Sequence, residues 1–181
     1  MSNYRRSYCQ AGTYFFTVVA YDRRPIFCEP IFRSALRNAI RETQLELPFE
    51  IDVWVLLPDH LHCIWTLPSN DNNFSIRWAK IKRNVTKQCS SLHSQQLMTP
   101  SKYKRKESTL WQRRFWEHQI RNEQDFAHHA DYIHYNPVKH GYVKRVVDWQ
   151  YSTFHRYVKQ GFYPQNWSCN LLEQPSIHPG E

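Results

Sequence analysis

Two runs of β-branched and aromatic residues follow one another in the middle of the chain and constrain its fold most. The first is FEIDVWVLL (49–57) and the second is HLHCIWTL (60–67), and only Pro58 and Asp59 separate them. Such runs favour β-strands, and a connection this short joins antiparallel strands rather than parallel ones. The sequence therefore predicts an antiparallel hairpin over this region.

Further strands and helices are expected on both sides of the hairpin. Strands are predicted over residues 13–21 and, shorter, within 110–120. Four helices are predicted, over residues 31–42, 74–90, 123–135 and 152–159. This order of elements predicts an α+β sandwich, with an antiparallel sheet and helices on one face.

Local signals mark the ends of several helices. Pro30 is tolerated as a first helical residue, and Asn122 is placed to cap the helix that follows it. Asn136 precedes Pro137 and is pushed out of the helical region, so that helix is expected to end near Tyr135. Gly141 fits a turn.

A chain of 181 residues fits one domain, expected over residues 1–165. Residues 166–181 are expected to form a loosely held tail, and the polar, basic stretch 91–109 to form a long, mobile loop. Four glycines are few for a Rossmann or P-loop architecture.

The formal net charge of +8, from 24 Lys and Arg against 16 Asp and Glu, predicts a polyanionic partner. Nucleic acid is the commonest such partner, although ribosome-associated and membrane-surface proteins share this balance. The five cysteines show no CxxC spacing, which indicates reduced thiols. With no signal peptide or membrane span in the sequence, we expect a cytoplasmic protein.

His60 and His62 are two residues apart in a predicted strand, so both side chains point to the same side. Leu61 and Cys63 point to the other side, which is apolar enough to face a core. Two imidazoles on one face can bind a single divalent ion. The alternative is a pair of solvated histidines, since ten histidines also produce this spacing by chance.

Tyr132 belongs to a polar stripe on a predicted helix. Asp125, His128, Tyr132 and Asn136 are three or four residues apart and lie on one side of that helix. The alternative is an ordinary solvated face in which the tyrosine only packs. Tyr135, three residues on, is a second candidate for any role given to Tyr132.

Basic residues interleave with aromatic residues near the N-terminus and again over residues 111–116. Arginine and lysine bind phosphates, and aromatic rings stack on unpaired bases. An ordinary basic surface would look the same. The residues expected to contact nucleic acid are Arg5, Arg6, Arg77, Lys80, Arg83 and Lys87.

A histidine pair that holds a metal ion and a helical tyrosine, on a basic domain, together indicate phosphodiester chemistry. A tyrosine hydroxyl has an ordinary pKa near ~10. It can attack a phosphate once a metal ion polarises the phosphoryl oxygen. The product is a covalent phosphotyrosine and one free hydroxyl end.

Five stretches of the sequence resemble the REP-associated tyrosine transposases, which are single-tyrosine members of the HUH nuclease superfamily. They are NYRRSYCQAGTYFFTV, LPDHLHCIWTLP, RFWEHQIRN, DYIHYNPVKHGYV and DWQYSTFHRY. The similarity covers about residues 3–90 and 110–165. It implies a ferredoxin-like α+β fold with a central antiparallel sheet, and cleavage and rejoining of single-stranded DNA near a tetranucleotide at the foot of REP-type hairpins.

By the same resemblance, His60 and His62 match the metal-binding histidines and Tyr132 matches the nucleophile. Asn136 stands where related transposases place a third metal ligand. The ion would be Mg²⁺ or Mn²⁺, and histidine ligands suit Mn²⁺ better. The expected partner is DNA, as single strands and hairpin repeats. We expect no membrane, a monomer in preference to a homodimer, and a cytoplasmic protein associated with the nucleoid when bound to DNA.

Two alternatives stay open at this point. One is a module that binds REP hairpins without cutting them. The other is an RNA-binding domain of similar fold, with Phe15, Phe16, Trp54 and Trp65 as stacking platforms.

Overall fold

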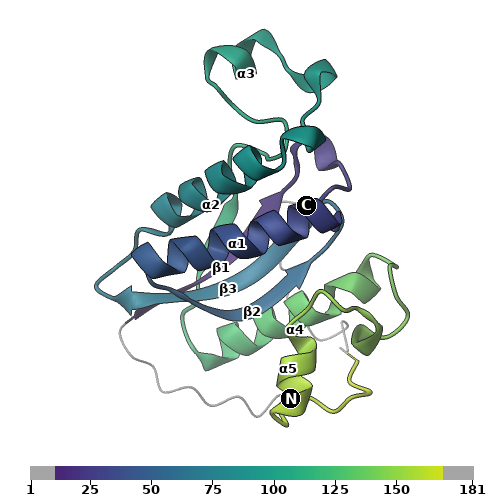
Figure 1. Ribbon diagram of the computed structural model, residues 1–181. Helices are drawn as coiled ribbons and strands as arrows, with labels where there is room; N and C mark the ends of the chain where they lie inside the picture. The colour runs from purple at the N-terminus through teal and green to yellow at the C-terminus, as the bar shows by residue number, and fades with distance from the viewer. Residues whose placement is uncertain (1–10, 169–181) are drawn as a thin grey trace.

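A four-stranded antiparallel sheet forms the centre of the computed structural model, which describes residues 11–168 (Figure 1). The strands are β1 (Ala11–Val19), β2 (Glu50–Leu56), β3 (His60–Ser69) and β4 (Trp116–Gln119), in the order β2-β3-β1-β4. β2 pairs with β3 antiparallel, with Leu56 opposite Leu61. The predicted hairpin and the predicted α+β class with an antiparallel sheet are both confirmed.

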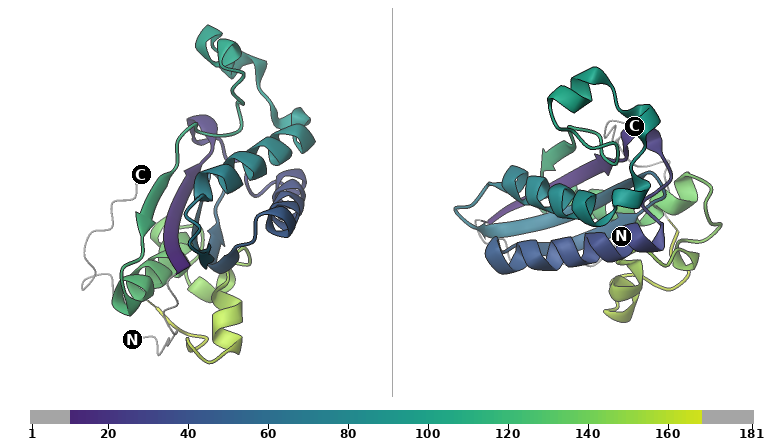
Figure 2. Two further views of the ribbon diagram at one scale, coloured as in Figure 1. Left: turned by 90° about the vertical axis from the view of Figure 1, so that its left-hand side faces the viewer. Right: turned by 45° about the horizontal axis from the view of Figure 1, so that its top comes forward.

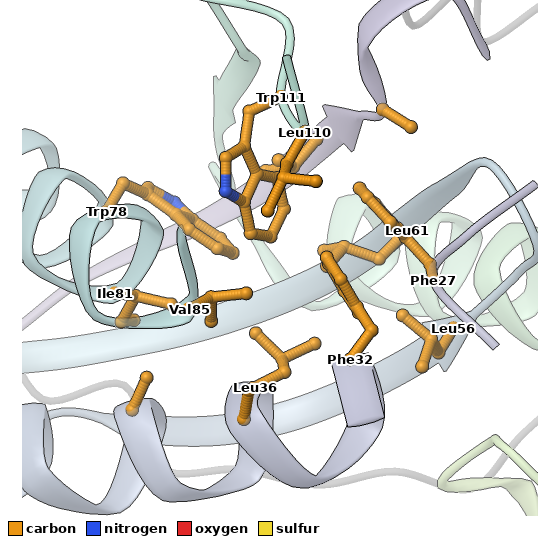
Figure 3. Packing of buried hydrophobic residues seen from close by; sticks show 14 of the residues in the cluster. Phe27, Phe32, Leu36, Leu56, Leu61, Trp78, Ile81, Val85, Leu110 and Trp111 are labelled. Carbon is orange, nitrogen blue, oxygen red and sulfur yellow. The ribbon is translucent and has the colours of Figure 1, made fainter. Parts of the chain in front are cut away.

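Helices α1 (Pro30–Glu46) and α2 (Phe74–Gln88) pack side by side on one face of the sheet (Figures 1 and 2). Aromatic rings fill the core beneath them, and Trp65 of β3 stacks on Trp78 of α2 with ring centroids 4.2 Å apart. Figure 3 shows part of this core, where Phe32 and Leu36 of α1 and Trp78 of α2 lie over the sheet together with Leu61 of β3.

Helices α4 (Glu123–Lys139) and α5 (Phe154–Lys159) cover the opposite face and enclose a second core. The expectation of helices on one face is therefore wrong. The physical reason is that neighbouring residues of the central strands are apolar on both sides. Phe15 and Phe16 point to opposite faces, and both are fully buried. A sheet of this kind needs a layer on each side.

Helix α4 begins as predicted, because the side chain of Asn122 accepts a hydrogen bond from the Asp125 amide at 2.8 Å. It does not end at Tyr135 but continues through Pro137 to Lys139. Pro137 is buried, and its packing outweighs the local preference against a helix before proline.

A glycine turn closes the C-terminus of α4. The Gly141 amide donates to the Val138 carbonyl and the Tyr142 amide to the Pro137 carbonyl, both at 2.9 Å. This bonding is a Schellman motif, which needs a left-handed residue after the cap. Gly141 supplies it with a φ of 72°, so the predicted turn is confirmed.

The stretch 91–109, predicted to be a long, mobile loop, contains secondary structure of its own. It includes the end of the 3-10 turn Ser90–Leu92, the 3-10 turn Gln95–Leu97 and the short helix α3 (Pro100–Lys104), with Thr99 as N-cap. It stands away from the body of the molecule in Figures 1 and 2. The strand predicted within 110–120 shrinks to β4, while Trp111 makes an isolated bridge to Ala20.

The packed part of the chain reaches beyond residue 165, since the ring of Trp167 lies 4.6 Å from that of Tyr163. Residues 169–181 lie outside the described residues, so most of the expected tail does too. Among the helices of residues 11–168, none has the length and apolar character needed to cross a membrane.

Candidate active site

The histidine pair opens β3 and faces the layer formed by α4. Alternation along the strand turns Leu61 and Cys63 into the first core, as predicted, and leaves His60 and His62 on the other side. Their exposed fractions are 1% and 0%, and their ring centroids lie 4.9 Å apart. The alternative of two solvated histidines is therefore wrong.

A neighbouring side chain binds the Nδ1 atom of each histidine. Nδ1 of His60 lies 2.7 Å from Oδ1 of Asp59, and Nδ1 of His62 lies 2.8 Å from Oγ1 of Thr17. Both Nε2 atoms are buried without a hydrogen-bond partner among residues 11–168. A buried polar atom without a partner is costly, and a histidine held through one nitrogen is ready to bind a metal through the other.

The electrostatics of the site favour a neutral imidazole at His62. Burial lowers its pKa well below the usual value, and the nearby charges of His60, His140, Lys139 and Arg23 lower it further. Burial alone would raise the pKa of Asp59, but hydrogen bonds from His60 and Arg23 outweigh it and hold that pKa below its usual value. A neutral imidazole is the form that binds metal ions.

Helix α4 brings Tyr132 against His62 and carries Asn136 one turn further on the same side of the helix. The Tyr132 ring lies 5.3 Å from the His62 ring, and Phe15 touches both. Tyr132 is 5% exposed and Asn136 is fully buried. This part of the polar stripe faces the sheet, so its interpretation as a solvated face is wrong.

Asn136 carries a second indication of a metal-binding site. Neither Oδ1 nor Nδ2 of its buried amide has a hydrogen-bond partner in the described part of the chain. Its oxygen can serve as a metal ligand beside the two imidazoles. The donor set of two imidazole nitrogens and one amide oxygen fits a divalent metal ion.

Tyr135, the other candidate nucleophile, faces a different part of the molecule. It lines a cavity of about 760 Å³ together with residues such as Lys144, Asp148 and Trp167. Of the two tyrosines, Tyr132 is the one whose ring contacts that of His62.

Four residues near the site were missed by sequence reasoning. Lys139 places its ammonium 5.0 Å from the centre of the Tyr132 ring, and the His140 ring lies 5.1 Å from that of His60. Both stand in the DYIHYNPVKHGYV stretch, which was a usable signal. Asp59 adjoins His60 in sequence, whereas Thr17 comes from a strand 45 residues away and left no signal.

A second cluster joins β4 to the start of α4. Ligand atoms of His118, Asp125 and His129 lie within 4.8 Å of one another, a spacing that could hold a metal ion. Asp125 already accepts hydrogen bonds from His118 and from the Arg121 amide, both at 2.9 Å. The cluster thus braces the helix that carries Tyr132.

Comparison with known proteins identifies the family. Residues 9–136 match the family model described as "Transposase IS200 like". The chain is 48% identical to the REP-associated tyrosine transposase of Escherichia coli K12 over 96% of this chain and 94% of that protein. It belongs to this transposase family. A putative REP-associated tyrosine transposase of Haemophilus influenzae is 47% identical, over 94% of this chain and 95% of that protein.

A solved structure agrees with the family assignment. It is described as the REP-associated tyrosine transposase bound to a REP hairpin. The match covers 100% of this chain and 98% of that one, with a TM-score of 0.79 and 44% identity. The chain is thus an enzyme, a tyrosine transposase, as the resemblance implied.

The basic residues expected to contact DNA differ in their exposure, and two of them lie outside the residues that the structure describes. These two are Arg5 and Arg6. Arg77 is 1% exposed and donates to the carbonyls of Leu47, Asn73 and Pro48 and to Asp71, so the structure contradicts its predicted role and makes it a structural residue.

Helix α2 also carries the other three predicted contacts. Lys80 forms an ion pair with Glu46, while Arg83 and Lys87 are exposed. The helix covers the face of the sheet opposite α4. Any contact of these residues with DNA would therefore be made on the side of the sheet away from Tyr132.

Within residues 11–168, the sheet has no open aromatic face of the kind that the RNA-binding alternative requires. Phe15, Phe16 and Trp65 are fully buried under the two helical layers. Trp54 is half-buried and packs at the edge of the first core.

Proposed function

We propose that this transposase cleaves and rejoins single-stranded DNA at REP-type hairpins, with Tyr132 as the nucleophile and His60, His62 and Asn136 as the ligands of a divalent metal ion. One observation carries the proposal: β3 and α4 hold three buried residues whose polar atoms have no hydrogen-bond partner within residues 11–168, together with a buried tyrosine whose ring contacts that of His62. The solved relative described as bound to a REP hairpin supports the substrate.

The reaction is a transfer of a phosphoryl group to tyrosine and back. The Tyr132 hydroxyl oxygen loses its proton and forms a bond to phosphorus. The bond from phosphorus to the leaving oxygen breaks, and that oxygen takes up a proton as a free hydroxyl end. Attack by a hydroxyl end on the phosphotyrosine reverses the step and rejoins a strand. A bound Mg²⁺ or Mn²⁺ would polarise the phosphoryl oxygen.

Residues of the chain position the reacting groups. Asp59 and Thr17 orient the two imidazoles through their Nδ1 atoms. Lys139 brings a positive charge to the Tyr132 ring, where it attracts the phosphate that the tyrosine attacks. The i to i+4 spacing of Tyr132 and Asn136 keeps nucleophile and ligand on one side of α4.

We further propose that the transposase works as a monomer in the cytoplasm and associates with the nucleoid when it binds DNA. Its single catalytic domain corresponds to the expected residues 1–165 and also includes Trp167, which packs on Tyr163. The exposed Arg83 and Lys87 are retained as DNA contacts. The net charge of +8 supports a partner of this kind.

The test is covalent adduct formation with a labelled REP-type hairpin that carries a single-stranded foot. Purified protein with Mn²⁺ is expected to form the adduct, and a chelator is expected to prevent it. Tyr132→Phe should abolish the adduct and keep hairpin binding, while Tyr135→Phe should keep both. An adduct with Tyr132→Phe but none with Tyr135→Phe would reverse the assignment.

The same assay addresses a binding module without catalysis. Tight hairpin binding without an adduct, whatever the metal and the sequence of the foot, would favour that alternative. A panel of hairpins from the intergenic regions of the source genome supplies the substrates.

A further inference from the structure

Residues 93–108 form an arm that leaves the body of the protein and returns to it (Figures 1 and 2). Arg24 ties the two ends of the arm together. Its guanidinium donates to the carbonyl of Leu92 at 2.9 Å and to that of Thr109 at 3.2 Å. The Ser94 amide donates to the Thr109 hydroxyl at 3.0 Å and closes the base.

A buried lysine fixes the outer part of the arm to the body. The ammonium of Lys102 lies 3.6 Å from the centre of the Tyr21 ring and donates to the Ser108 carbonyl at 3.2 Å. Lys102 is only 6% exposed. Such a cation–π contact away from water stabilises one placement of helix α3. The arm is therefore a structured element.

The tip of the arm presents an aromatic ring and positive charges to solvent. Tyr103 is 78% exposed, and Lys104 and Lys106 are exposed beside it. Neither lysine forms an ion pair within residues 11–168, whereas Arg105 pairs with Glu107. Lysines of this kind bind phosphates as point charges, and an exposed tyrosine can stack on a base.

The arm is attached at the end of the sheet that carries the histidine pair. Tyr21, which holds Lys102, lies one residue after Ala20, whose amide donates to the Asp59 carbonyl at 2.7 Å. The Asp59 side chain in turn holds His60. The base of the arm and the proposed metal site thus share the segment around Asp59.

We propose that the arm is a second DNA-contacting surface, which binds phosphates of the DNA that extends from the cleavage site. The inference rests on the proposed function, because it takes that site as the point from which the DNA leaves. The phosphates belong either to the hairpin stem or to the single strand that flanks it.

The test measures DNA affinity as a function of salt for the full chain and a double variant, Lys104→Ala with Lys106→Asn. Asparagine suits position 106 because Lys106 has a left-handed φ of 53°. The logarithm of the binding constant falls as the logarithm of the salt concentration rises. Removing two phosphate contacts should make this fall less steep, by about 1 in the slope per lysine. A matched control removes two exposed charges from α1, Arg37→Ala with Arg41→Ala, and should keep the slope.

Two ligands separate the sources of phosphate: a closed hairpin without flanks and an unpaired oligonucleotide with the sequence of the flank. If the double variant shows a less steep salt dependence only with the hairpin, the arm binds the stem. If it shows this with the unpaired strand, and Tyr103→Ala also weakens binding to that strand, the arm binds the flank. An unchanged slope on both ligands, or an equal loss in the α1 control, overturns the proposal.

A readout of the Tyr132 site keeps this result apart from the proposed function. The double variant should still form the covalent adduct with a short single strand at saturating concentration. If the unaltered protein neither binds DNA nor forms an adduct, the proposed function fails. If the unaltered protein binds DNA and forms the adduct, and the arm variants show the same salt dependence as the unaltered protein, only the inference about the arm fails.

Discussion

The Nδ1 atom of His62 lies 2.8 Å from the hydroxyl oxygen of Thr17 on the neighbouring strand, and both side chains are buried. This contact fixes the ring so that Nε2 faces the site. Thr17→Val should weaken Mn²⁺ binding about 10- to 100-fold, the usual cost of losing a partner behind a metal ligand. Isothermal titration calorimetry measures the affinity. Thr17→Ser keeps the hydroxyl and should bind like the unaltered protein, and equal losses in both variants would argue against an orienting role.

Asn136 should lower the stability of the metal-free protein and be needed for metal binding. Its buried amide has no hydrogen-bond partner within residues 11–168, and such a group costs about 1–3 kcal/mol. Asn136→Leu should raise the free energy of unfolding of the metal-free protein by a similar amount, as measured by urea denaturation. The same variant should lose most of its Mn²⁺ affinity.

Asn136→Asp is the informative partner of that variant. It keeps an oxygen ligand but buries a carboxylate, so the metal-free protein should lose stability and Mn²⁺ should restore more of it than in Asn136→Leu. If Mn²⁺ stabilised the leucine variant as much as the unaltered protein, Asn136 would not be a ligand.

Low pH should destabilise the cluster of His118, Asp125 and His129 at the start of α4. Burial lowers the pKa of His129 below its usual value, and this outweighs the raising effect of Asp125. The unfolded chain therefore binds a proton at a higher pH than the folded protein does. Stability is full above the ordinary histidine pKa near ~6.5 and falls as the pH drops below it. Urea denaturation at pH 7.5 and 5.5 should show this fall, and His129→Gln should show less of it. An identical fall in the variant would remove His129 as its source.

The turn after α4 should depend on its glycine for backbone reasons alone. A Cβ atom at Gly141 would meet nothing within 4 Å, so the cost of Gly141→Ala comes from the left-handed φ of 72°. The expected loss is about 1 kcal/mol in the free energy of unfolding. Gly141→Asn should lose less, because asparagine tolerates this conformation. If Gly141→Ala lost no more stability than Gly141→Asn, this account would be contradicted.

Features set by neighbours in the sequence could be predicted. The hairpin of β2 and β3 and the cap at Asn122 follow from local patterns and formed as expected. The alternation in β3 correctly separated the histidine pair from the core around Leu61. These signals work because strand alternation and helix capping act over a few residues.

Features set by distant partners could not be predicted. The burial of Arg77 depends on the carbonyls of Leu47 and Pro48, about thirty residues away, so its sequence surroundings predict an exposed DNA contact instead. The structure of the arm depends on contacts with Tyr21 and Arg24 near the first strand, which the composition of residues 91–109 does not show. Helix α4 continues past Pro137 because of tertiary packing, whereas the local preference before proline predicts that it ends at Tyr135.

The division of the proposed catalytic groups between β3 and α4 has a consequence for how activity would be lost under stress. The histidines belong to the sheet, while the tyrosine and the asparagine belong to a helix that reaches the sheet through β2 and β3. If this helix detaches while the layer of α1 and α2 stays folded, nucleophile and metal ligands separate. Loss of adduct formation would then report undocking of one layer, ahead of any signal from global unfolding.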